Sequence, residues 1–261
     1  MQTSKLFIAC SNVQQVPSIL NYSLNSNEVI IYTIYFPNFI DLKSDLIQFL
    51  NDTELTRAGR FHRELDRNQF IIYRSILKFV LAAHTNLDIK NIHLEYHLNK
   101  KPYLASHPNL HFNISHSEDF AVIAISRDEV GIDIEYINKD FNFEELLPEI
   151  FNDNEILAIQ NATNKKHAFY TSWTRKEAFV KALGKGIDED FKDVPCLDGD
   201  HSIPALLKTS ANWQMYSFNL ADHYLGAVAF ESSPTISKNL VLFSIPNTMD
   251  SLREMTQIRK N

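Results

Sequence analysis

Two acidic residues, Asp133 and Glu135, stand one residue apart in the stretch Val130–Glu135, where they alternate with isoleucines. In a β-strand successive side chains alternate between faces, so both carboxylates would point one way, and Ile132 and Ile134 the other way, into a core. Two like charges side by side repel unless a divalent cation or a basic side chain neutralises them. Hard cations such as Mg²⁺ prefer carboxylate oxygens. The pair therefore fits a metal site or, as for most acids, a solvated edge strand.

A third carboxylate lies in the segment Phe169–Leu183, which is predicted to form a helix that ends at Gly184. Glu177 and Lys181 are i,i+4 neighbours beside the apolar face of this helix. They fit an ordinary surface ion pair, worth ~0.3–0.5 kcal/mol, or a carboxylate and a cation that belong to one site. Lys176 falls near the apolar stripe, so it either extends toward solvent along that stripe or lies at the start of a shorter helix.

A run of polar residues occurs in the segment Phe112–Ser117. Asn113, Ser115, His116 and Ser117 all carry groups able to hold a phosphate or a ribose. A purely structural role is the alternative for His116. The next strand, residues 120–126, would turn through residues 127–129 into residues 130–135, which predicts a hairpin of these two strands.

Basic side chains recur in the helical segment 41–84. They are Arg57, Arg60, Arg63, Arg67, Arg74 and Lys78. The pattern fits an amphipathic helix with a solvated cationic face. Guanidinium groups also bind phosphates well, so some of these arginines are candidates for phosphate contacts. Lys100 and Lys101 precede Pro102 in a predicted turn, where they place two positive charges next to each other.

The remaining segments are expected to support this site. Residues 28–36 are predicted to form a strand, residues 143–151 and 153–159 short helices, and residues 213–220 and 224–230 a hairpin. Residues 1–27 and 231–261 carry no functional signal, and the last of these fade into a polar tail. Each half of the chain contains strands and a long helix, which permits an internal duplication.

Composition narrows the class of protein. The 261 residues can bury a sizeable core, and 44% of them are hydrophobic, as in ordinary globular proteins. The net charge of −7 argues against a nucleic-acid binder that works through bulk charge. Two cysteines without pair spacing indicate neither a disulfide framework nor a zinc site, which fits a reducing cytosol. No apolar run is long enough for a signal peptide or a membrane span, so we expect no membrane association.

Three motifs occur in a fixed order: FNISHS at 112–117, VGIDIE at 130–135 and WTRKEAFVKALGKG at 173–186. This order resembles the 4′-phosphopantetheinyl transferases, specifically their larger Sfp type, over residues 53–230. Residues 131, 133 and 135 match the family's Gly-hydrophobic-Asp-hydrophobic-Glu strand, and residues 173, 176, 177, 178 and 181 match its Trp-x-x-Lys-Glu-(Ala/Ser)-x-x-Lys helix. Lys101-Pro102 resembles the family's Lys-Pro turn, although Lys100 stands where a glycine usually precedes it.

The resemblance implies an α+β fold of two similar α/β subdomains, related by a pseudo-two-fold axis as in an internal duplication. We expect residues 1–128 to form the N-terminal subdomain and residues 129–230 the C-terminal subdomain that carries the metal site. Residues 231–261 would be a C-terminal extension. The family also implies a cytoplasmic monomer.

The activity that the resemblance implies is transfer of 4′-phosphopantetheine from coenzyme A to a serine of an acyl or peptidyl carrier protein, with release of 3′,5′-ADP. The expected metal ligands for Mg²⁺ are Asp133, Glu135 and Glu177. Glu177 would also act as the base, and Lys181 would contact the attacked and leaving phosphates. The residues expected to bind coenzyme A are Arg57, Arg74, Lys101, Ser115, His116, Lys176 and Lys181. Trp173 is assigned to packing.

Other functions fit the same residues. A different Mg²⁺-dependent phosphodiesterase or nuclease could use three carboxylates, and a non-catalytic relative could bind coenzyme A or a carrier protein without transfer. Fatty-acid, polyketide and nonribosomal-peptide carriers all remain possible substrates, and Mn²⁺ remains an alternative to Mg²⁺. Because carrier proteins are usually acidic and this chain is also acidic, docking would need a local basic or apolar patch, for which residues 57–78 are a candidate.

Overall fold

The computed structural model describes residues 4–11, 13–15, 23–85, 87–186, 189–232 and 238–257. The strands are β1 (Lys5–Cys10), β2 (Gln14–Gln15), β3 (Glu28–Tyr35), β4 (Glu95–Tyr96), β5 (Pro102–Tyr103), β6 (His111–Ser117), β7 (Phe120–Ser126), β8 (Val130–Tyr136), β9 (Gly199–Ser202), β10 (Asn212–Ala221), β11 (Tyr224–Ser232) and β12 (Asn239–Ser244). The α-helices are α1 (Lys43–Leu46), α2 (Asp52–Ala58), α3 (Glu64–His84), α4 (Leu147–Ile150), α5 (Asp153–Asn161), α6 (Lys165–Ala182) and α7 (Met249–Gln257). The structure is thus a mixed α+β fold.

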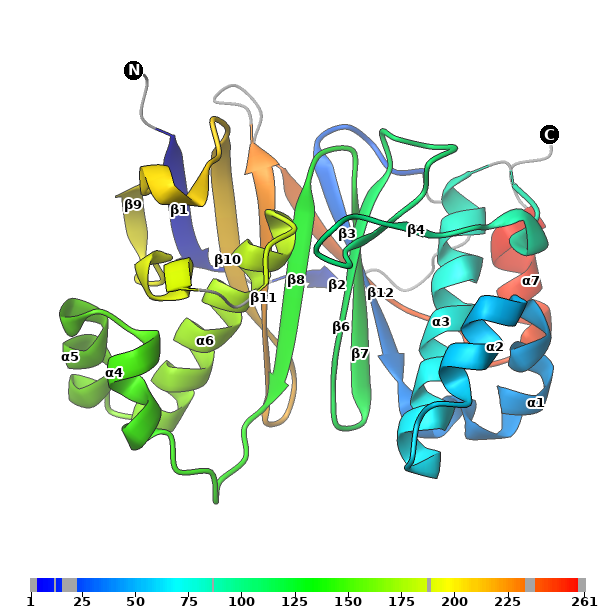
Figure 1. Cartoon of the computed structure of the whole chain (residues 1–261), viewed down its shortest axis with the longest axis horizontal. Helices are drawn as coiled ribbons and strands as arrows, with labels where there is room; N and C mark the ends of the chain where they lie inside the picture. The colour runs from blue at the N-terminus through cyan, green and yellow to red at the C-terminus, as the bar shows by residue number, and fades with distance from the viewer. Residues whose placement is uncertain are drawn as a thin grey trace.

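Two five-stranded sheets stand side by side in Figure 1, with β8 and β6 next to each other in the middle of the molecule. Sheet A has the order β8-β11-β10-β1-β9, and sheet B the order β2-β12-β3-β7-β6. Helix α6 packs on sheet A, whereas α3 shares a hydrophobic core with sheet B. Strands β4 and β5 form a separate small ribbon.

The same arrangement of elements occurs in both sheets. In sheet B, β3 is followed by α3 and then by the β6–β7 hairpin, and β7 pairs with both β3 and β6. In sheet A, β8 is followed by α6 and then by the β10–β11 hairpin, and β11 pairs with both β8 and β10. All four of these pairings are antiparallel.

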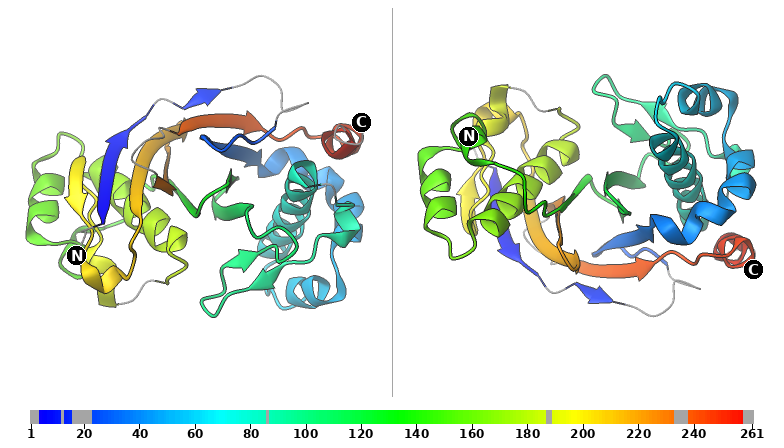
Figure 2. Two further views of the ribbon diagram at one scale, coloured as in Figure 1. Left: turned by 90° about the horizontal axis from the view of Figure 1, so that it is seen from above. Right: turned by 90° about the horizontal axis from the view of Figure 1, so that it is seen from below.

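The two ends of the chain cross over between the sheets. Strand β1 pairs in parallel with β10 of sheet A, and β12 pairs in parallel with β3 of sheet B. Figure 2 shows the blue N-terminal strand beside the elements of sheet A and the red helix α7 beside the blue and cyan helices that cover sheet B. The sheets therefore do not follow a division of the chain at residues 128 and 230. Residues 5–10 lie in sheet A with the second part, and residues 239–244 lie in sheet B with the first part. The predicted polar tail contains a buried strand and a helix that packs on α3.

The predicted hairpin of residues 120–126 and 130–135 is wrong. Strand β7 has β3 on one edge and β6 on the other, so neither of its edges is available to β8. The backbone partner of β8 is β11, almost a hundred residues further along the chain, with Asp133 opposite Ala227. The short turn at 127–129 indicated a local pairing, but the pairing that forms is long-range.

The inner faces of the two sheets share one hydrophobic core. Ile132 and Ile134 of β8 are buried there together with Val29 and Ile31 of β3, as the alternating pattern of β8 predicted. The opposite face of β8 lies against α6, and Gly131 makes this approach very close. A Cβ atom added at Gly131 would lie 2.2 Å from the carbonyl oxygen of Ala178 in α6. Only glycine at this position lets the helix backbone lie directly on the strand.

Helix α6 begins earlier than predicted and ends where predicted. The side chain of Asn164 accepts a hydrogen bond from the backbone N–H of His167 and caps the first turn. The helix ends at Ala182, and Gly184 follows with a φ of +65°, a conformation that favours glycine. Within the described ranges, no helix is both long and apolar enough to cross a membrane.

Candidate active site

The face of β8 that lies against α6 carries Asp133 and Glu135. Asp133 is 3% exposed and Glu135 is partly buried, so neither is a surface acid on a solvated strand. A buried carboxylate needs partners that compensate for its lost hydration. Each of the two carboxylates has such partners, and they come from α6 and from β6.

Helix α6 contributes a stripe of three residues to this face, namely Trp173, Glu177 and Lys181, at i, i+4 and i+8. The Nζ atom of Lys181 lies 2.6 Å from Oδ1 of Asp133, in an ion pair whose carboxylate is almost fully buried. At the other end of the stripe, Nε1 of Trp173 donates a hydrogen bond to Oε1 of Glu135 at 3.3 Å. Trp173 was assigned to packing alone, and this bond adds a polar contact to that role.

Strand β6 contributes two serines from the other sheet. Ser115 Oγ donates to Oδ1 of Asp133 at 2.8 Å, and Ser117 Oγ donates to Oε2 of Glu135 at 3.0 Å. Lys181 Nζ also donates to Ser115 Oγ at 3.1 Å. Ser115 was predicted to contact coenzyme A, but its described partners are Asp133 and Lys181. The direct link from both serines to the metal-ligand candidates was missed, although the matching Ser-x-Ser and Asp-x-Glu spacings were visible in the sequence.

Burial and crowding of negative charge perturb the carboxylates. Burial raises the pKa of Glu177 to about 7; the ammonium of Lys181 opposes this rise, while Asp133 and Glu135 add to it. Burial and the neighbouring Asp133 likewise raise the pKa of Glu135. Burial by itself would lower the pKa of Lys181, but the carboxylates of Asp133, Glu177 and Glu135 together raise it above its ordinary value. The site therefore holds more negative charge than Lys181 alone balances.

The donor set of this site suits a hard divalent cation. Oδ2 of Asp133 is buried and has no hydrogen-bond partner among the residues that the structure describes, so it is an acceptor left open beside the other carboxylates. An added cation would satisfy that oxygen and relieve the repulsion that raises the pKa of Glu177. As the side chains stand, no three His, Cys, Asp or Glu residues of the described chain are gathered closely enough to form a complete ligand cluster. The chemistry of these residues fits Mg²⁺, although their side chains do not form a ligand cluster as they stand.

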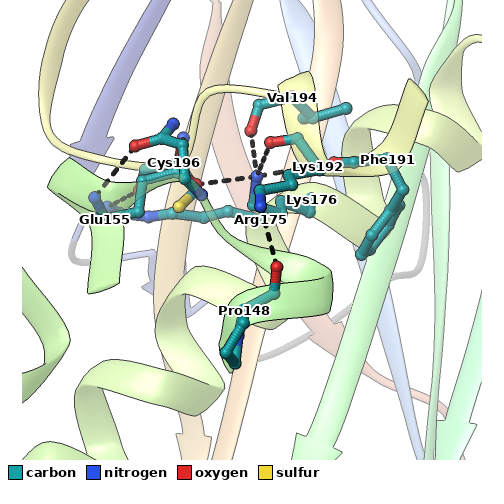
Figure 3. Close-up of polar contacts among 9 residues, drawn as sticks. Pro148, Glu155, Arg175, Lys176, Phe191, Lys192, Val194 and Cys196 are labelled. Carbon is teal, nitrogen blue, oxygen red and sulfur yellow. Dashed lines mark hydrogen bonds and ion pairs between the residues drawn. The ribbon is translucent and has the colours of Figure 1, made fainter. Parts of the chain in front are cut away.

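Lys176 does not lie at this site, although it was predicted to bind coenzyme A. Its side chain is fully buried and pairs with Glu155 Oε2 at 2.9 Å. Figure 3 shows its ammonium directed at the backbone carbonyls of Lys192 and Val194, which lie 2.9 and 2.5 Å away. Both alternatives from the sequence, a lysine extended toward solvent and a lysine at the helix start, are wrong. Lys176 lies in mid-helix and joins α6 to α5 and to residues 191–194.

Lys101 is also held by protein groups. Its ammonium donates to Oε2 of Glu129 at 2.7 Å, to the carbonyl of Ala182 at 2.9 Å and to that of Val130 at 3.2 Å. These three acceptors match the three donors of an ammonium, so none remains for a phosphate in this arrangement. Lys100, in the position of the family's usual glycine, has a φ of +63°, the left-handed conformation that glycine adopts most readily.

The structure brings Arg57, Arg74 and His116 together around one cavity of about 350 Å³, between α2, α3 and β6. One guanidinium nitrogen of Arg74, Nη1, is buried without a hydrogen-bond partner. Burial and then the nearby Lys181 lower the pKa of His116, whose ring lies 5.6 Å from that of Tyr73. The Arg74 guanidinium also pairs with Glu54 Oε1 at 3.9 Å and lies over the ring of Phe70, so Nη1 is the part of it that remains for an anion at this cavity.

A second cavity of about 260 Å³ opens on the other side of Glu135, where Ser117 and Trp173 form part of its wall. Aromatic and aliphatic side chains, among them Phe141 and Leu146, form most of the rest. Among the described residues that line it there is no lysine, arginine or histidine. The two cavities therefore differ in charge, and the second borders Glu135 directly.

Comparison with known proteins gives one consistent family. A family model described as "4′-phosphopantetheinyl transferase superfamily" matches residues 129–229, and one described as "4′-phosphopantetheinyl transferase, N-terminal" matches residues 41–128. The chain is 30% identical over 220 residues to the 4′-phosphopantetheinyl transferase HetI of Nostoc sp., covering 82% of this chain and 92% of that protein. It is 27% identical over 161 residues to the 4′-phosphopantetheinyl transferase Sfp of Bacillus subtilis, covering 60% and 71%. It is also 29% identical over 157 residues to the human L-aminoadipate-semialdehyde dehydrogenase-phosphopantetheinyl transferase, covering 54% and 50%.

The raised pKa of Glu177 predicts a pH-dependent stability for the metal-free protein. Between the ordinary value of 4.5 and about 7, the unfolded state has released the proton that the folded state still holds, so stability falls as the pH rises. Glu177→Gln removes this penalty. We expect the variant to be more stable than wild type at pH 8 and equally stable at pH 5, as measured by urea unfolding in EDTA. Glu145→Gln, at an exposed position, is the control and should show no such difference; the same gain at both pH values in Glu177→Gln would contradict the argument.

The buried position of Lys176 predicts a loss of stability rather than of coenzyme binding. Lys176→Met leaves Glu155 buried without its counter-ion, which typically costs ~3–5 kcal/mol. Adding Glu155→Gln should recover part of this loss in urea unfolding, and Lys165→Met at the exposed start of α6 should have little effect. A Lys176→Met protein of normal stability with weakened binding of coenzyme A would restore the original assignment.

Proposed function

The chain belongs to the 4′-phosphopantetheinyl transferases, and we propose that Asp133, Glu135, Glu177 and Lys181 form its catalytic site. The enzyme transfers the 4′-phosphopantetheine group of coenzyme A to a serine hydroxyl of a carrier protein and releases 3′,5′-ADP. The observation that carries the site assignment is the ion pair of Lys181 with Asp133 at 2.6 Å, together with the pKa of Glu177, which burial raises and to which the charges of Asp133 and Glu135 add.

The residues proposed to hold Mg²⁺ are Asp133, Glu135 and Glu177, and Mn²⁺ is the alternative ion. A divalent cation bound there would neutralise charge on the pyrophosphate of coenzyme A. The orphaned Oδ2 of Asp133 and the excess negative charge of the site support this assignment.

Glu177 is proposed to accept the proton of the carrier serine. In the metal-free protein burial raises its pKa to about 7, which makes Glu177 a stronger base than an exposed glutamate. Lys181, whose side chain is 29% exposed, would hold its positive charge toward the phosphate under attack and toward the leaving phosphate. Because phosphoryl transfer depends mainly on positioning and on neutralised charge, these two side chains supply what the chain itself must contribute.

The two cavities are proposed to hold the two ends of coenzyme A. The cavity at Arg57, Arg74 and His116 would bind the nucleotide with its 3′-phosphate, and the buried unsatisfied nitrogen of Arg74 supports this. The cavity beside Glu135 lacks cations and suits the neutral pantetheine arm. Because Lys101 and Lys176 are committed to protein acceptors, we now propose them as supports of α6 rather than as ligands of the nucleotide.

An internal duplication is proposed for the two halves, supported by the repeated β-α-β-β order in the two sheets. The crossed ends modify the expected division, since residues 5–10 belong with sheet A and residues 239–257 with sheet B. A cytoplasmic monomer that acts on an acyl, peptidyl or polyketide carrier remains a proposal.

The decisive experiment is transfer itself. The protein is mixed with coenzyme A, Mg²⁺ and several apo carrier proteins, and intact-protein mass spectrometry should detect one added phosphopantetheine on a carrier serine. Asp133→Asn and Glu177→Gln should each lower the rate by at least ~10²-fold. Asparagine is preferable to alanine at 133, because it keeps an acceptor for Ser115 and Lys181. Asp140→Asn, at an exposed position, should leave the rate unchanged; normal transfer by Asp133→Asn would refute the assigned site.

The assignment of the cavities predicts a separable effect on the two ends of coenzyme A. Leu146→Trp, which fills the cation-free cavity, should raise the KM for coenzyme A several-fold and leave inhibition by 3′,5′-ADP unchanged. Arg57→Ala should weaken the binding of both compounds. Leu157→Trp, at an exposed position of α5, serves as the control for an added bulky side chain. If Leu146→Trp raised only the KM for the carrier protein, the cavity would instead belong to the carrier.

A further inference from the structure

The two carboxylates of β8 are held by a regular set of donors from two different elements. Asp133 receives one hydrogen bond from Ser115 of β6 and one from Lys181 of α6. Glu135, two residues later, receives one from Ser117 of β6 and one from Trp173 of α6. The two serines are also two residues apart, so their spacing on β6 matches that of the two carboxylates on β8. Ser117 therefore donates to Glu135 in the same way that Ser115 donates to Asp133.

Strands β6 and β8 lie side by side without a backbone ladder between them. Each is the edge strand of its own sheet, and side chains of β6 take the place of the missing pairing. Asn113 Oδ1 accepts the backbone N–H of Ile132, and Ser117 Oγ accepts that of Tyr136. We call this line of contacts the seam.

The hydroxyl of Ser117 has its roles fixed by these contacts. Its oxygen accepts the N–H of Tyr136 at 3.1 Å, and a hydroxyl carries only one proton to donate. That proton is directed to Oε2 of Glu135 at 3.0 Å. Ser117 therefore links the backbone of β8 to the Glu135 side chain of the same strand.

Glu135 needs such a restraint more than Asp133 does. A glutamate side chain has one more rotatable bond than an aspartate, and Glu135 borders an open cavity into which it could turn. The bond from Trp173 is long, at 3.3 Å, whereas the bond from Ser117 is shorter. Of its two donors, Ser117 makes the closer contact.

We propose that Ser117 is a positioning residue that reaches across the seam and fixes Glu135 in the orientation needed to bind the divalent cation together with Asp133 and Glu177. The proposal rests on the proposed function, since it assigns a purpose to the orientation of a metal ligand. Hydrogen-bonding partners behind metal ligands typically contribute ~10–100-fold in metal affinity. Ser117 is not proposed as a metal ligand itself, and it acts on the metal through Glu135.

The test compares Ser117→Thr with Ser117→Val, two side chains of nearly the same shape of which only threonine keeps the hydroxyl. Ser117 lines a cavity, so the added methyl group has room. Binding of Mn²⁺ to the protein without coenzyme A is followed by electron paramagnetic resonance. Ser117→Val should weaken binding by about 10-fold, and Ser117→Thr should bind as wild type does. Ser202→Ala, at an exposed position of β9, is the control for removal of a strand hydroxyl.

A double variant shows whether Ser117 acts through Glu135. In a Glu135→Gln background, Ser117→Val should cause no further loss of Mn²⁺ affinity. In transfer assays at limiting Mg²⁺, Ser117→Val should have a lower kcat than Ser117→Thr, which adds the same bulk, and this difference should disappear when Mg²⁺ is raised. A merely structural role would not give this recovery.

The outcomes separate this inference from the proposed function. If wild type binds Mn²⁺ and modifies a carrier while Ser117→Val and Ser117→Thr bind Mn²⁺ equally well, the inference is overturned and the function stands. An equal further loss in the Glu135→Gln background would also overturn it. A wild-type protein that neither binds Mn²⁺ nor modifies any carrier would instead overturn the proposed function.

Discussion

The close contact between β8 and α6 is the constraint on which the site depends. Gly131 on the strand faces Ala178 and Ala182 on the helix, and an added Cβ would lie 2.2 Å from backbone atoms of both alanines. This contact between small residues brings the helix close to the strand. The stripe of Trp173, Glu177 and Lys181 can then reach the carboxylates of β8. A larger residue at position 131 would force the helix outward and separate Lys181 from Asp133, whose atoms now lie 2.6 Å apart. Packing at Gly131 thereby sets the distance between the charges of Asp133 and Lys181.

The lysines beside this contact show how position decides the role of a cation. Lys176 and Lys181 lie on the same helix and both belong to the family's helix motif. Lys181 faces the strand and keeps 29% of its side chain exposed, whereas Lys176 faces the opposite way and is fully buried against Glu155 and backbone carbonyls. Lys101 binds the carbonyl of Ala182 at the end of the helix, where a cation also interacts favourably with the helix dipole. Lys176 and Lys101 therefore hold α6 in place, whereas Lys181 pairs with Asp133 and keeps part of its side chain exposed.

The sequence predicted those parts of the site that depend on local periodicity. Alternation along β8 placed Ile132 and Ile134 in the core and Asp133 on the other face, and helical spacing placed Glu177 beside Lys181. What it did not predict depends on contacts distant in the chain. The partner of β8 is β11, and the first and last strands exchange sheets, because open strand edges select partners by the whole fold rather than by the nearest turn. Lys176 was misjudged for the same reason, since Glu155 and residues 191–194 approach it only in three dimensions.

The location of the site at the seam follows from the charges that it contains. The carboxylates of β8 point out of the sheet, whereas the backbone donors of its partner β11 lie within the sheet, in the β8–β11 ladder. An edge strand of a second sheet offers side-chain donors instead, and Ser115 and Ser117 of β6 supply them. These serines are neutral, so they orient the carboxylates without cancelling the negative charge that a divalent cation would need. A lysine in place of either serine would satisfy the carboxylate fully and remove the reason for a metal to bind. The seam thus fixes the orientation of the two β8 carboxylates while leaving part of their negative charge uncompensated. This combination needs elements of both sheets.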